Sequence, residues 1–142
     1  ILATITILAA FIIIYLIQAR SRRNHHSGSR VSFDSGLFRL KWQEIQEQIS
    51  SASPIHHKNA VIEADKLLDY FLKSKFGAKQ TMGDRLKKAQ SLFNNREAYN
   101  AAWAAHKVRN TLVHEADSEF FYAQAKKAVS EFERAFHGLR LI

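Results

Sequence analysis

Apolar side chains recur at steps of three and four residues along this chain, and this spacing restricts the fold more than any other feature. Near the carboxyl end the repeat consists of Phe121, Ala125, Ala128, Phe132, Ala135 and Leu139. An earlier repeat consists of Phe38, Trp42, Ile45, Ile49 and Ala52. Residues three and four apart share one face of an α-helix, so each repeat predicts an amphipathic helix. No stretch of the sequence alternates with the period of two that is typical of a half-buried strand, and we expect an all-α fold.

The chain has one proline and five glycines, so residues that break helices are few and indicate where helices end. The spacing predicts a bundle of about five helices. The first helix is expected from near Phe38 to Ser53–Pro54, the second from His56 to Gly77, and the third from the cap Thr81 to Asn94–Asn95. The fourth is expected from about Glu97 to Val113, and Asp117–Ser118 caps the last one.

The second predicted helix has an inward apolar face and an outward charged face. The inward residues are Val61, Ala64, Leu68 and Phe71. The residues predicted to point mostly outward are Glu63, Asp65, Lys66 and Asp69.

Residues 1–18 carry no charge, which predicts a transmembrane helix. A cleaved signal peptide is the competing interpretation, but its positive charge would precede the apolar run, whereas Arg20, Arg22 and Arg23 follow it. Basic residues beside a span stay on the cytoplasmic side. We therefore expect a single-pass protein of the inner or plasma membrane that contacts the lipid bilayer through residues 1–18 and has a cytoplasmic carboxy-terminal domain.

Residues 19–36 are rich in serine, arginine and histidine and predict a basic flexible linker. The helical domain is then expected at 37–142. The net charge of +8 alone would suggest a nucleic-acid partner. Four arginines of the linker supply half of it, so membrane-flanking charge together with a solvated surface is the better explanation for most of this value.

The sequence offers no pattern for a metal or a cofactor. The absence of cysteine excludes disulfides and thiolate ligands. Glycine-rich phosphate loops and paired catalytic carboxylates are absent from the sequence as well. We therefore expect no metal and no cofactor.

The segment Ala105–Glu115 combines polar side chains with a strongly helical pattern. At about 100° per residue, His106, Asn110 and His114 lie within roughly 80° of one another on a helix. A second face, formed by Ala105, Val108 and Leu112, is an ordinary buried stripe. The polar face holds groups that can donate, accept and transfer protons.

Arg109, followed by the polar Asn110 and, after four intervening residues, by His114, resembles the arginine–histidine signature of HEPN domains. The setting is similar too, because a wholly helical domain surrounds the motif. From Phe38 to Leu141 the chain also resembles small membrane-anchored bacterial proteins that share a run like Tyr99–Glu115. The resemblance implies a ribonuclease in which two copies pool their motifs at a two-fold interface, or a non-catalytic scaffold.

Metal-independent RNA cleavage needs a base, an acid and a cation for the phosphate. His114 can exchange a proton near neutral pH, Arg109 presents a fixed charge in a planar fork, and Asn110 can orient a hydroxyl or the imidazole. These three are the candidate catalytic residues. Candidate substrate-binding residues are His106 beside them, Lys107 as a phosphate contact, and Trp103 as a stacking platform for a base.

Arg109 and His114 are about 140° apart on an ideal helix, so they do not converge by themselves. They can converge if the helix unwinds near His114, if the long side chain of Arg109 reaches around the helix, or if two copies of the motif meet across a dimer axis. The last option is the one that the resemblance implies, and we expect a homodimer that acts on RNA or binds a nucleotide.

A structural role for the same residues is the alternative. Arg109 would then pair with Glu115 or Asp117, His114 would cap helix carbonyls, and Asn110 would fix the helix register. Tyr99 and Trp103 would belong to the core. The corresponding function is that of a non-catalytic, membrane-anchored adaptor that binds a protein partner.

Overall fold

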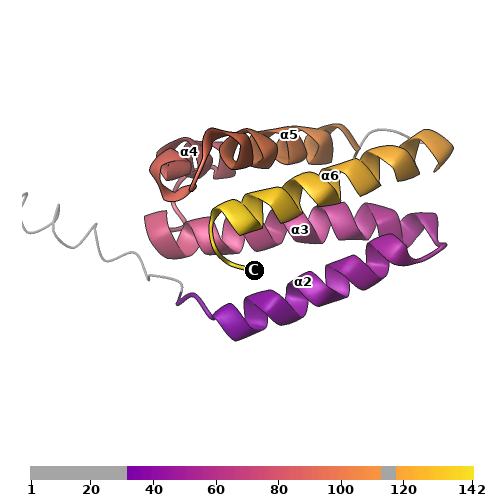
Figure 1. The fold of residues 1–142 in the computed structure, drawn as a ribbon, viewed down its shortest axis with the longest axis horizontal. Coiled ribbons are helices and arrows are strands. Elements are labelled where there is room, and N and C mark those ends of the chain that lie inside the picture. The colour runs from indigo at the N-terminus through magenta and orange to yellow at the C-terminus, as the bar shows by residue number, and fades with distance from the viewer. Residues whose placement is uncertain (1–31, 113–117) are drawn as a thin grey trace, which may run out of the picture. The chain divides into compact units, whose positions relative to one another are not determined.

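The computed structural model describes residues 32–112 and 118–142, with the side chains of 118–121 left out. These residues form α-helices and one short 3-10 helix, with no strand among them. The predicted all-α class and the expectation of about five helices are confirmed for this part of the chain. The elements in Figure 1 are α2 (Ser35–Ser50), α3 (Pro54–Phe76), α4 (Met82–Lys88), η1 (Ala89–Leu92), α5 (Arg96–Leu112) and α6 (Ser118–Gly138).

The expected anchor at 1–18 and most of the expected linker lie outside the described residues. Among the helices that the structure does describe, none is both long enough and apolar enough to cross a bilayer.

Helix α3 is the hub of the bundle. It packs along α2 and α6 and also contacts α4 and α5, while α5 packs mainly on α6 (Figure 1). A helix with neighbours on several sides buries more than one stripe. This explains why the buried residues of α3 extend well beyond the predicted inward face: His57, Ala60, Val61, Ala64, Asp65, Leu67, Leu68, Phe71 and Leu72.

Aromatic rings fill the core where α2 meets α6. Phe38 and Trp42 each meet the ring of Phe136 edge-on, with centroids 5.0 Å apart. Ile45, on the same face of α2, is also buried. The repeat predicted on the last helix is buried from Ala125 to Leu139, whereas the side chain of its first member, Phe121, lies outside the described residues.

The packed domain includes residues ahead of its expected start at 37. Asp34 caps α2, accepting hydrogen bonds from the backbone N–H groups of Gly36 and Leu37 at 2.8 and 3.0 Å. The N–H of Asp34 in turn donates to the Tyr70 hydroxyl, which donates to the carbonyl of Ser32. These bonds join the last residues of the expected linker to α3.

The predicted helix signals at Gly77 and Thr81 are confirmed. Gly77 follows the last residue of α3 with a φ of 81°, a conformation that glycine adopts without strain. The Thr81 hydroxyl accepts from the N–H of Asp84 at 3.1 Å and donates to its carboxylate at 2.6 Å. This side-chain hydrogen bond from Thr81 lowers the pKa of Asp84 below its ordinary value.

Helix α4 is joined to α3 through an ion pair whose arginine is buried. The guanidinium of Arg85, only 2% exposed, binds the carboxylate of Asp69, with Nε 3.1 Å from Oδ1. The carbonyl of Gln80 accepts a further bond from the same guanidinium. The predicted outward orientation of Asp69 is therefore wrong, because α4 folds over this side of α3.

The end of α6 crosses the start of α5 at very short range, and Gly138 allows this approach. A Cβ added to Gly138 would lie 2.2 Å from the Cβ of Ala98, whereas a Cβ added to Gly83 in α4 would meet Trp103 at an ordinary 3.7 Å. We expect Gly138→Ala to lower the free energy of unfolding by about 1–3 kcal/mol, because the two helices must move apart. Urea unfolding followed by circular dichroism measures this change.

The matched control for that variant is Gly83→Ala. It should leave the stability unchanged or raise it by up to about 1 kcal/mol, since alanine favours a helix and meets no obstacle there. Equal stability of the two variants would contradict the close crossing of α5 and α6.

Candidate functional site

The polar motif lies on α5, whose opposite side is almost entirely alanine. Ala98, Ala101, Ala102 and Ala105 are buried with Leu112 at the end of the helix. These small side chains bring α5 close to its neighbours. The predicted stripe is confirmed at Ala105 and Leu112, while Val108 is partly buried against the same core.

A buried carboxylate of α3 holds two residues of α5 together. Asp65 is 5% exposed, and its Oδ1 lies 2.8 Å from Nδ1 of His106. An ionised carboxylate only accepts hydrogen bonds, so Nδ1 of His106 is the donor in this contact. The predicted outward orientation of Asp65 is wrong, because α5 covers this side of α3.

Arg109 is the second residue at Asp65. Its Nε lies 3.5 Å from Oδ2 of Asp65, an ion-pair distance without a hydrogen bond, and this Nε is buried with no hydrogen-bond partner. Nη1 donates to the side-chain oxygen of Asn110 at 3.1 Å. About a third of the Arg109 side chain is exposed. Arg109 is therefore loosely paired and open to solvent.

The surroundings of Arg109 add a second cation. Lys58 and Ile62 of α3 line a shallow recess with Arg109 and Leu112. The recess is too shallow to enclose a ligand, so a bound molecule would lie on the surface. Lys58 and Arg109 together exceed the charge of Asp65, which favours an anion.

The remaining candidate residues of α5 differ in exposure. Lys107 and Asn110 are exposed, and the Lys107 carbonyl accepts a bond from the Thr111 hydroxyl. Trp103 is partly buried against the core, with its ring 6.2 Å from that of His106. Tyr99 packs in the same way against Phe93. Both aromatic residues contribute to the core, and Trp103 also borders the site.

The structure thus brings together Asp65, His106, Arg109 and Asn110 within one chain, which we call the Asp65 cluster. His114, Glu115 and Asp117 lie outside the described residues, as do the predicted contacts of Arg109 with the last two. Asp65 could have been found from the sequence. It lies four residues after Val61 and three before Leu68, within the apolar stripe itself.

No group of three or more histidine, aspartate and glutamate side chains that could hold a metal occurs in the described part of the chain. Comparisons with protein-family models, curated proteins and solved structures find no match for the chain.

The contact between Asp65 and His106 should be measurable as an energetic coupling. In a double-mutant cycle with Asp65→Ala and His106→Ala, we expect a coupling free energy of about 1–3 kcal/mol, because each single change leaves a partly buried polar group without its partner. Urea unfolding of the four proteins supplies the values.

The surface pair Glu131–Arg134, with atoms 3.1 Å apart and a half-exposed arginine, is the control cycle. Its coupling should stay below about 1 kcal/mol. If the two cycles gave the same small coupling, Asp65 would not hold His106 in place.

Proposed function

We propose that this domain is a HEPN-like module that binds RNA phosphate at the Asp65 cluster and cleaves RNA without a metal. It acts as a homodimer tethered to the membrane through residues 1–18. The observation that carries the proposal is the buried carboxylate of Asp65, which holds an imidazole and a guanidinium at the protein surface.

Arg109 supplies the charge for the phosphate. Its guanidinium fork suits phosphate oxygens, and its loose ion pair leaves N–H groups for a ligand. Lys58, beside it in the recess, adds a second positive charge. Asn110, which accepts from Nη1 of Arg109, limits how far the fork can turn.

Two histidines supply the proton transfers. One takes the proton of the 2′-hydroxyl, whose oxygen then attacks the phosphorus, and the other protonates the departing 5′-oxygen. The products are a cyclic phosphate and a free 5′-hydroxyl. His114 is one of these groups in the proposal. His106 is the other, because a carboxylate that holds Nδ1 fixes the ring and supports proton exchange at Nε2.

An adaptor function is the second candidate, and the ion pair between Arg109 and Asp65 favours it. A guanidinium that already has a carboxylate within the chain satisfies part of its charge without a substrate. In that case the Asp65 cluster would fix the packing of α3 against α5, and the domain would serve to bind a protein partner.

An RNA degradation assay on the purified full chain tests the proposal. We expect Arg109→Ala to slow cleavage by about 10²–10³-fold, through loss of charge stabilisation at the phosphate. His114→Ala should slow it by about 10²–10⁴-fold, through loss of a proton-transfer group. Gel analysis of a fluorescent single-stranded RNA gives the rates.

Arg134→Ala is the matched control, since it removes an exposed arginine of α6 that pairs only with Glu131 among the described residues. Its rate should equal that of the unchanged chain. Cleavage that persists in both Arg109→Ala and His114→Ala would point to contamination and overturn the assignment. An unchanged chain that cleaves no RNA but retains a specific protein partner would support the adaptor.

A further inference from the structure

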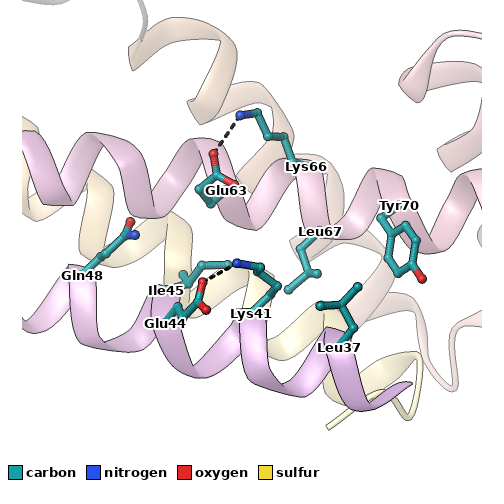
Figure 2. A pocket seen from close by; sticks show the side chains of 9 residues that line it. All are labelled: Leu37, Lys41, Glu44, Ile45, Gln48, Glu63, Lys66, Leu67 and Tyr70. Carbon is teal, nitrogen blue, oxygen red and sulfur yellow. Dashed lines mark hydrogen bonds and ion pairs between the residues drawn. The ribbon is translucent and has the colours of Figure 1, made fainter. Parts of the chain in front are cut away.

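A groove runs along the surface between α2 and α3, and it does not belong to the Asp65 cluster, which lies between α3 and α5. Its apolar lining comes from Leu37, Ile45 and Leu67, with the ring of Tyr70 at one end (Figure 2). The cavity measures about 190 Å³. Gln48 lies at the other end, and its side-chain oxygen is buried without a hydrogen-bond partner.

The same face carries exposed apolar side chains. Leu37 is 45% exposed, and Leu40 is 55% exposed. Leu40 does not line the groove, but it lies three residues after Leu37 and four before Glu44, which places it beside them on α2. The two leucines are among the few large apolar residues that the described structure leaves in solvent. Because the groove and the exposed leucines belong to one surface, the leucines of one chain can cover the groove of a second copy in a two-fold contact.

Lysine and glutamate side chains line the groove in an arrangement that favours one kind of partner. Lys41 pairs with Glu44 on α2 at 2.7 Å, and Lys66 pairs with Glu63 on α3 at 2.8 Å. Figure 2 shows the two lysines at one level of the groove and the two glutamates at the next. Like charges therefore face each other across the groove, and opposite charges follow each other along it.

This arrangement of charges is complementary to a second copy of itself that is rotated so that its helices run in the opposite direction. A two-fold axis perpendicular to the helices, at the level between Lys41 and Glu44, places the lysine level of one copy on the glutamate level of the other. An axis parallel to the helices would place lysines on lysines. The four charges sum to zero, so the face attracts neither an acidic nor a basic partner, although the whole chain carries +8.

We propose that this surface, the α2–α3 face, is a homodimer interface in which the α2 helices of two copies pack antiparallel. Leu37 and Leu40 of each copy cover the groove of the other, and the lysine and glutamate levels pair between the copies. The buried oxygen of Gln48 gains access to donors of the second chain. The Asp65 cluster stays outside this contact, so this dimer differs from the motif-pooling dimer that the HEPN resemblance implies. The inference therefore does not depend on RNA cleavage.

The test uses two charge variants of the full chain in mild detergent. Lys41→Glu/Lys66→Glu makes the α2–α3 face wholly acidic, and Glu44→Lys/Glu63→Lys makes it wholly basic. Each variant repels its own copy, so we expect the dimer dissociation constant to rise by at least about tenfold in each case. An equimolar mixture should form a heterodimer, because every pair across the interface is then attractive.

Light scattering gives the mass, and circular dichroism shows that each variant is folded. The control is Lys126→Glu/Lys127→Glu on α6, which should dimerise like the unchanged chain. The proposal is overturned if the unchanged chain is monomeric, if both charge variants dimerise as it does, or if the folded variants fail to pair when mixed. Because RNA cleavage is assayed separately, loss of the dimer and loss of activity remain distinguishable.

Discussion

The packing of α3 against α5 depends on the buried carboxylate of Asp65, which needs polar partners. Burying an ionised group without a partner lowers the stability by roughly several kcal/mol, even after the protein relaxes. Asp65 is nearly inaccessible, so α5 must present partners at its level, and His106 and Arg109 are those partners. The rotation of α5 about its own axis is therefore fixed by these contacts with Asp65 as well as by the packing of its alanine face. The motif is consequently oriented by the same contact that would prepare it for chemistry.

Helix α3 carries three polar arrangements on different sides. Asp69 receives Arg85 beneath α4, Asp65 receives the residues of α5, and Glu63 pairs with Lys66 beside α2. In the first, Arg85 is almost fully buried and Asp69 is 16% exposed, and the pair has a structural role. The second is partly open and carries the proposed site, while the third lies along the α2–α3 face. Differences in exposure thus separate the roles of similar side chains on one helix.

Periodicity alone predicted much of the fold. The helical class, the core faces of α2 and α6, the cap at Thr81 and the stop at Gly77 all follow from local preferences, and the structure contains them. The acidic residues of α3 were misplaced for a physical reason. A pattern for one buried face assumes that charge points to solvent, but α3 is covered on several sides. Asp65 is buried and Asp69 is partly covered because basic residues farther along the chain reach them. The place of Asp65 within the apolar stripe indicates its burial, but local sequence does not reveal the basic partners of either residue.

Nuclear magnetic resonance of the domain, residues 31–142, during titration with a short single-stranded RNA tests the central claim most directly. We predict that the side-chain signals of Arg109 and His106 shift together as RNA binds, and that Asp65→Asn weakens these shifts while the domain stays folded. RNA that shifts signals only on other surfaces, or shifts these two equally in Asp65→Asn, would contradict the role of Asp65 in forming an anion site.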